Sequence, residues 1–128
     1  MKKVFLLAFL SLIVVAGAFA QNIGRIEQNG RDFLVFNEAG VRMASQNIGR
    51  GNHNLVGWGR DFFIVQYQNT LQSHDARGRR IGRWNSRAIN PITLVRIANE
   101  RIYVYTTREV GGNVRLARLD RQLRSVTN

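Results

Sequence analysis

Two short segments recur in the same order along this chain of 128 residues, and such an internal repeat restricts the fold more than any single motif. The pentapeptide Gln-Asn-Ile-Gly-Arg occupies residues 21–25 and returns unchanged at residues 46–50. A second segment, residues 30–36 with the sequence Gly-Arg-Asp-Phe-Leu-Val-Phe, returns at 59–65 and more loosely at 100–105. Because two different segments repeat in one order, we infer duplication into three units. Their expected bounds are residues 21–45, 46–80 and 81–128.

The apolar runs are short, and glycine, asparagine or aspartate separates them at the spacing that is typical of an all-β chain. The predicted strands are residues 31–37, 41–46, 55–58, 61–68, 70–74, 80–84, 92–97, 101–107 and 113–119. The linkers between them are too short for the helical crossovers that parallel pairing needs. We therefore predict an antiparallel meander of about three sheet-like repeats, with a small β-barrel or sandwich as the alternative.

The second unit reads as a four-stranded meander whose last strand follows the turn Asp75-Ala76-Arg77-Gly78 and ends at Trp84. An aspartate, two residues and a glycine before a strand that closes on tryptophan resembles a blade of a β-propeller, most closely the quinoprotein type. This resemblance implies a propeller-like fan of sheets, and it carries over no cofactor or catalytic residue. Propellers have about 4–8 blades, so three units form an open fan or a half-ring completed by a second copy.

Two interpretations fit the C-terminal residues 114–126. Leu116, Leu119, Leu123 and Val126 follow the spacing of one helical face, and a basic amphipathic helix of this kind lies on anionic membranes. The alternative divides the segment into two strands around Asp120, which then matches Asp75 of the second unit. The match between the two turns favours the strands.

Residues 1–20 have the order of a secretory signal peptide: Lys2 and Lys3, an apolar run, and a small-residue end at Ala20. We expect cleavage after Ala20, export to the bacterial periplasm or the extracellular space, and no integral membrane span after processing. The remaining residues 21–128 form one domain of ordinary small size. The chain contains no cysteine, so its core must be stable without disulfides.

Arginine supplies every cationic side chain beyond the signal segment, histidine aside, and the whole chain carries a formal net charge of +11. A guanidinium donates two parallel hydrogen bonds to a carboxylate or phosphate, whereas lysine offers a point charge. The densest group of arginines is the candidate anion-binding site: Arg77, Arg79, Arg80, Arg83 and Arg87. Strand alternation allows Arg77, Arg79 and Arg83 to share one face.

Trp58 and Trp84 each end a predicted strand beside glycine or asparagine, and they are candidate aromatic contacts for a ligand. Catalytic and metal-binding patterns are absent from the sequence. His53 lies in a Gly/Asn-rich turn, and His74 and Asp75 are neighbours on a predicted strand, where adjacent side chains point to opposite faces. We expect both histidines at surface or turn positions, no catalytic residue, no metal site and no cofactor.

The sequence therefore predicts an exported, non-enzymatic binding domain that engages an anionic polymer or envelope surface through clustered arginines. Its partners would present phosphate, sulfate or carboxylate groups. The alternative function is a structural module that pairs through sheet edges, either as a homo-oligomer or with a larger propeller-type partner, because exposed strand edges invite such pairing.

Overall fold

The computed structural model describes residues 22–49 and 51–126, and the expected signal peptide lies outside them. The described chain is all-β, with ten strands in three antiparallel sheets that follow one another as a meander. This confirms the predicted fold class, and the three separate sheets exclude a single closed barrel or a two-sheet sandwich. Among these residues, no helix is long and apolar enough to cross a membrane.

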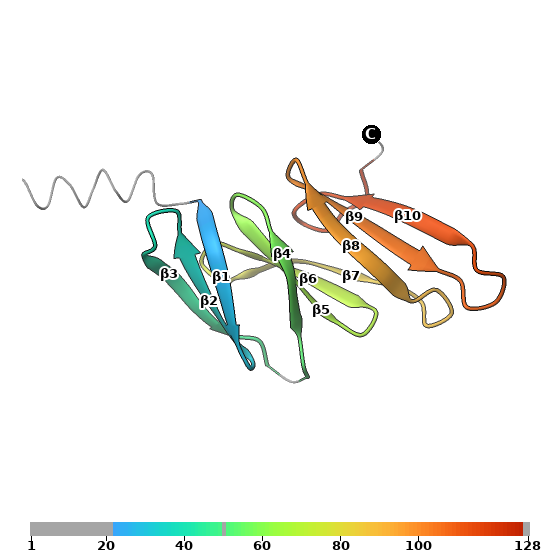
Figure 1. The fold of residues 1–128 in the computed structure, drawn as a ribbon, viewed down its shortest axis with the longest axis horizontal. Coiled ribbons are helices and arrows are strands. Elements are labelled where there is room, and N and C mark those ends of the chain that lie inside the picture. The colour runs from blue at the N-terminus through green and yellow to red at the C-terminus, as the bar shows by residue number, and fades with distance from the viewer. Residues whose placement is uncertain (1–21, 50, 127–128) are drawn as a thin grey trace, which may run out of the picture.

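The first sheet contains β1 (Ile23–Asn29), β2 (Asp32–Asn37) and β3 (Arg42–Asn47). The second contains β4 (Asn54–Trp58), β5 (Phe62–Tyr67), β6 (Thr70–Asp75) and β7 (Arg80–Asn85). The third contains β8 (Ile92–Ala98), β9 (Arg101–Thr107) and β10 (Val114–Leu119). The first strands of the three sheets are neighbours, because β4 contacts both β1 and β8, and the sheets form an open row (Figure 1).

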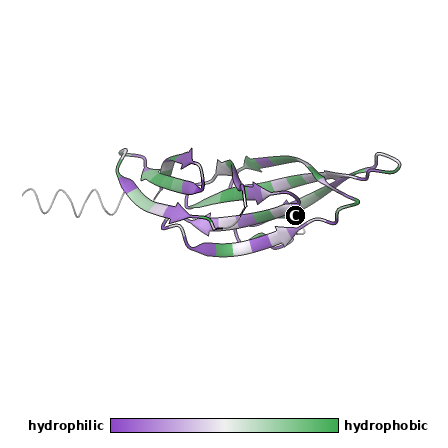
Figure 2. Ribbon diagram, turned by 90° about the horizontal axis from the view of Figure 1, so that it is seen from below, coloured by the Kyte–Doolittle hydropathy of each residue, from purple (hydrophilic) through white to green (hydrophobic). Residues whose placement is uncertain are grey.

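Hydrophobic residues alternate with polar ones along most strands, as the ribbon coloured by hydropathy shows (Figure 2). In β2, Phe33 and Val35 are buried and face the second sheet, while the alternate residues Leu34 and Phe36 lie on the outer face. β5 is different, because its residues 62–65 are all fully buried. A strand buried on both faces belongs to the middle layer of a stack.

One apolar core lies between the first and second sheets. Its centre is Phe63, whose ring stacks on Phe33 with centroids 6.1 Å apart and on the other side meets the ring of His74 at 5.1 Å. Ile23 and Ile48, one from each copy of the repeated pentapeptide, are both buried in this core. The pentapeptide is thus repeated because each copy contributes an isoleucine to the same interface.

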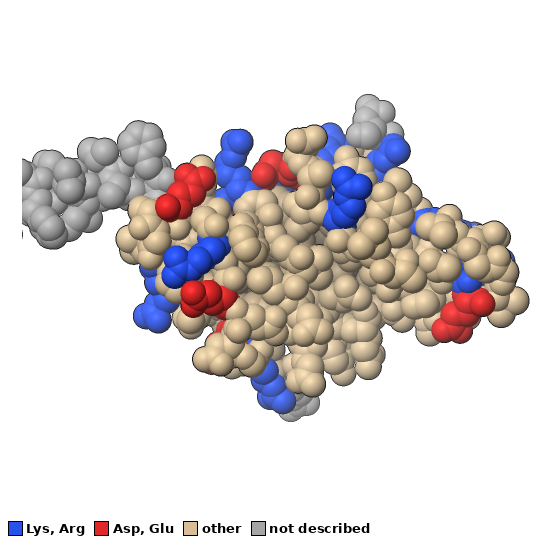
Figure 3. Space-filling model, viewed as in Figure 1, with Lys and Arg blue, Asp and Glu red and all other residues tan. Residues whose placement is uncertain are grey.

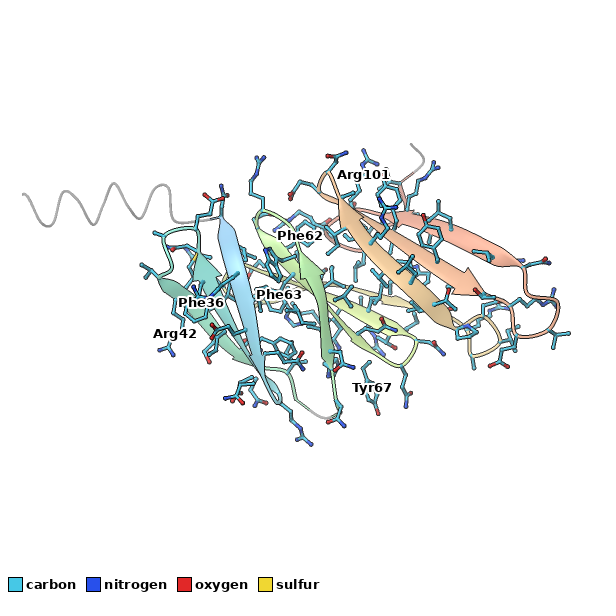
Figure 4. The ribbon with its side chains drawn as sticks, viewed as in Figure 1. Phe36, Arg42, Phe62, Phe63, Tyr67 and Arg101 are labelled. Carbon is cyan, nitrogen blue, oxygen red and sulfur yellow. The ribbon has the colours of Figure 1, made fainter. Side chains whose placement is uncertain are left out.

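A second apolar core joins the second and third sheets. Phe62 and Ile64 of β5 pack there against Ile102 and Val104 of β9, with Leu71 and Leu119 completing the fully buried set. Phe62 and Phe63 are sequence neighbours that point to opposite sides of the second sheet (Figure 4). The second sheet is therefore packed against an apolar core on both of its faces.

The repeated Gly-Arg-Asp-Phe segments are structurally equivalent, since each forms the turn into the second strand of its sheet. The arginine carbonyl in each turn accepts a hydrogen bond from an isoleucine N–H of the repeated pentapeptide. Ile48 donates to Arg31 at 3.0 Å and Ile23 donates to Arg60 at 2.7 Å. The second of these bonds ties the first sheet to the second.

One turn geometry occurs three times, at Asn37, Asp75 and Asp120. Each of these residues accepts, through its side chain, the backbone N–H four positions later, at 2.9–3.0 Å. The residue three positions later is Gly40, Gly78 or Leu123, and all three have positive φ. Leu123 tolerates this less favourable conformation because its side chain is buried in the second core. Asp120 is therefore equivalent to Asp75, and the helix is excluded. The first of the two predicted strands is β10, whereas the chain after Asp120 returns only as a single bridge between Ser125 and Leu119.

The structure differs from the sequence prediction in three places. β1 was not predicted, because a register shift near Gly24 breaks its alternation and leaves only Ile23 and Ile26 buried. The sheets divide the chain within 48–53 and 86–91, so the expected unit boundary after Arg80 falls inside β7. Both histidines are buried rather than on the surface.

Candidate functional site

Two of the predicted anion-binding residues, Arg77 and Arg79, lie in the tight turn between β6 and β7. The carboxylate of Asp75 accepts the backbone N–H groups of both, each at 2.9 Å. The Arg79 guanidinium also pairs with Asp75, its Nε lying 3.2 Å from Oδ2. Asp75 thus fixes the turn and partly neutralises Arg79.

Arg80 and Arg83 are exposed on β7, the outer edge strand of the second sheet. They lie opposite His74 and Gln72 of β6, two residues whose side chains share the face turned toward the first sheet. A register shift between Ser73 and His74 places both arginines on this face, although an odd number of positions separates them. Arg83 therefore shares its face of β7 with Arg80, and not with Arg79 as predicted.

Arg87 is separated from Arg77 and Arg79 by the length of β7, the strand that carries Arg80 and Arg83. It lies in the loop that connects β7 to β8, whereas Arg77 and Arg79 precede the strand. Six residues of extended chain span roughly 20 Å, so the five predicted residues do not form one patch.

The Arg87 end of β7 contains an open pocket between the second and third sheets, with a volume of about 310 Å³. Trp84, half-buried against the second core, and Arg87 line it from the β7 side, and Arg115 of β10 lines it from the other. None of its lining residues is acidic. An aromatic ring with two arginines in a concavity of this size is suited to a small anionic group.

The loop that carries Arg87 is held in place by backbone hydrogen bonds at both ends. Ser86 donates to the Asn69 carbonyl at 2.7 Å, and Thr107 donates to the Pro91 carbonyl at 3.1 Å. Arg115 lies directly opposite Thr106 in the register of β9 and β10, and Thr106 faces the second sheet. Both arginines are thus attached to ordered backbone, although their side chains are exposed.

Trp58, the other predicted aromatic contact, does not join this pocket. It is the last residue of β4, lies opposite Phe63 in the register and is 38% exposed. The two predicted tryptophans therefore belong to different regions of the surface. Arg115 was missed, because only the stacking of the third sheet on the second brings β10 to the end of β7.

On the face shown in Figure 3, basic side chains lie apart from one another with uncharged surface between them. The ion pairs among the described residues are Arg25–Glu27, Arg79–Asp75, Arg121–Asp61 and Arg124–Asp120. The arginines of the pocket and of β7 have no such partner there. Unpaired guanidinium groups keep their full charge for an external anion.

His74 is buried, and burial lowers its pKa below the usual value for histidine. Its Nδ1 donates to the Gly78 carbonyl at 3.2 Å, so the ring supports the β6–β7 turn and stacks on Phe63. Within residues 22–49 and 51–126, no group of three or more His, Cys, Asp or Glu side chains is placed to hold a metal ion.

No protein-family model matches the chain, and a search of curated proteins finds no similar sequence. The functional inference consequently depends on the site alone.

Proposed function

We propose that the protein is an exported, non-enzymatic binding domain that engages an anionic polymer or envelope surface through arginines. The observation that carries this proposal is the pocket of Trp84, Arg87 and Arg115, where two guanidinium groups flank a concavity without an acidic residue. Arg80 and Arg83, exposed on the edge strand β7, provide further contacts for an extended ligand.

Two features support this proposal. The order of charges in residues 1–20 is that of an export signal. His74, whose pKa is lowered by burial, lies in the core and does not line the pocket. We also propose that the three sheets are related to propeller blades, because β1, β4 and β8 lie side by side as the innermost strands of such blades do (Figure 1).

The second candidate function is assembly through sheet edges. β3, β7 and β10 are the outer edge strands of their sheets within the described residues, and each is free to pair with another chain. All three carry exposed arginines, however: Arg42 on β3, Arg80 and Arg83 on β7, and Arg115 and Arg118 on β10. Like charges along an edge discourage pairing with a second copy, so the edges favour an anionic partner.

Retention on immobilised heparin tests the pocket. We expect Arg87→Ala/Arg115→Ala to weaken binding at low salt by at least about tenfold, since a hydrogen bond to a charged group contributes roughly 1.5–3 kcal/mol. The matched control is Arg31→Ala/Arg60→Ala, which removes the same charge from two exposed turn positions outside the pocket.

Equal losses in the two double variants would mean that net charge alone governs binding and that the pocket is not the site. Failure of the unaltered protein to bind heparin even at low ionic strength would overturn the proposed function. Self-association of the unaltered protein that persists at about 0.5 M salt would instead point to edge assembly, because salt screens exposed charges but leaves backbone hydrogen bonds and apolar burial in place.

A further inference from the structure

The outer face of the third sheet carries a regular array of tyrosine, arginine and leucine side chains. Ile102 and Val104 of β9 point into the second core, so the residues between them, Tyr103 and Tyr105, lie on the opposite face. Both tyrosines are half-buried on the central strand, with β8 on one side and β10 on the other.

The strand register arranges this face in two rows. Arg96, Tyr103 and Arg118 form one row across β8, β9 and β10. Leu94, Tyr105 and Leu116 form the next, and the two leucines are 51% and 43% exposed. Each tyrosine is therefore flanked on both sides, the first by guanidinium groups and the second by aliphatic groups.

Two carboxylates that border the third sheet, Asp120 and Glu100, are already engaged. Asp120, two positions beyond Arg118, accepts the backbone N–H groups of Gln122 and Arg124. Glu100 accepts the backbone N–H of Arg60 with both oxygens at 3.0 Å. Among the described residues, neither Arg96 nor Arg118 has an ion pair. Two copies of this face would bring arginines against arginines, so charge selects an anionic occupant over a second copy.

We propose that this face is a stacking platform for single-stranded nucleic acid. Bases stack on Tyr103 and Tyr105, and Arg96 and Arg118 contact the phosphates. The proposal deepens the proposed function, on which it rests, by naming one class of anionic polymer. Exposed aromatic rings on a sheet surface are a common means of binding single-stranded nucleic acid, because every base has a stacking face.

The spacing of the tyrosines favours nucleic acid over a sulfated or uronic acid glycan. Alternate residues of a strand are about 6.7 Å apart, a distance that an extended single strand spans between adjacent bases. A glycan would use the arginines in the same way and would gain less from two successive aromatic rings. A duplex offers no unstacked base to either ring.

The test compares two oligomers of equal charge, each about 12 nucleotides long: oligodeoxythymidine and an abasic deoxyribose-phosphate chain. Fluorescence anisotropy at about 50 mM salt measures binding of the purified protein to both. We expect oligodeoxythymidine to bind at least about tenfold more tightly. Tyr103→Leu/Tyr105→Leu should abolish that preference, with a loss of about 5- to 150-fold for each ring.

Tyr103→Phe/Tyr105→Phe, which keeps both rings, should restore the preference, and Tyr67→Leu is the control for a tyrosine on another sheet. Thermal melting checks that each variant folds. Equal binding of the two oligomers, or tighter binding of a duplex, would overturn the stacking platform. The proposed function would still stand in that case if the protein is retained on heparin. Loss of heparin binding as well as oligomer binding in the unaltered protein would overturn both.

Discussion

The outer faces of the first and third sheets are the two ends of the same stack, and they differ in how their side chains are covered and paired. On the first sheet, the guanidinium of Arg25 lies 4.0 Å from the ring centroid of Phe36 and covers it. Glu27 holds that guanidinium with a 3.2 Å contact to Nε. On the third sheet, Leu94 and Leu116 are exposed and Arg96 has no carboxylate partner among the described residues. Stacked repeats need a polar cap on each end, so the uncapped third sheet presents a surface for binding.

Register explains how similar residues produce two different ends. Arg25 stands directly opposite Phe36, with Glu27 two positions along the same strand, so cation, ring and carboxylate lie on one face (Figure 4 shows Phe36 and Arg42 on this side of the molecule). On the third sheet, the cross-strand neighbours of Tyr103 are Arg96 and Arg118. The residue two positions from Arg96 is Leu94, and the residue two positions from Arg118 is Asp120, whose carboxylate already accepts backbone N–H groups. A single acidic residue therefore separates a closed face from an open one.

The largest expected effects are losses of folding stability, and they differ between the two cores that join these ends. Phe63→Ala should lower the free energy of unfolding by about 3–5 kcal/mol, because the phenylalanine is fully buried between Phe33 and His74. Val104→Ala, in the other core, should cost about 2 kcal/mol, since it removes a smaller side chain.

Urea unfolding measures both variants. If the stack unfolds as one unit, each variant gives a single transition shifted to lower urea. Two transitions in Phe63→Ala alone would show that the first sheet separates from the rest before the second core opens. Unchanged midpoints in both variants would contradict the assignment of these residues to the cores.

The next largest effect should be a pH dependence of folding stability that arises in the first core, because that core contains His74, whose pKa is shifted. Burial lowers the pKa of His74 in the folded state, and the Arg80 charge acts in the same direction, while Gly78 and Asp75 oppose it. The unfolded chain therefore binds more protons. Stability should decline as the pH falls through about 6.5 and level off below the folded-state value.

Melting temperatures between about pH 7.5 and pH 5 test this prediction, with His74→Gln as the comparison. The variant should have a flatter profile, since it retains His53 and every acidic group but loses the titrating ring. A decline of the same size in both proteins would assign the effect to other groups.

Much of this architecture was predictable from the sequence, for reasons that particular strands show. The Gly-Arg-Asp-Phe repeat correctly marked β2 and β5 as equivalent, because a Gly-Arg turn precedes each strand, and before β2 its Gly30 has positive φ. β1 escaped prediction because its two buried isoleucines lie three positions apart across a register shift. The four consecutive apolar residues of β5 were predicted only as part of a strand, although such a run is typical of a strand covered on both faces.

The site was less predictable, since it depends on contacts between sheets. Arg87 and Trp84 were identified, but their partner Arg115 lies 28 positions beyond Arg87 and joins them only when the third sheet stacks on the second. Arg77 and Arg79 were grouped with them by closeness in sequence, yet an extended strand of six residues carries neighbours apart. Sequence density of arginines therefore overestimates their density in space.

The smallest expected effect tests the cap itself. Arg25→Ala removes the guanidinium from Phe36 and should lower stability by about 0.5–1 kcal/mol, the usual contribution of an exposed cation–π contact. Arg96→Ala, a matched change on the first strand of the opposite end, should leave the melting temperature nearly unchanged, because that guanidinium has no ion pair among the described residues. The variant with Arg25 replaced should also expose an apolar ring and bind a hydrophobic dye more strongly. Equal stability losses at the two positions would mean that Arg25 is not a cap, and the contrast between the closed first sheet and the open third sheet would then rest on Leu94 and Leu116 alone.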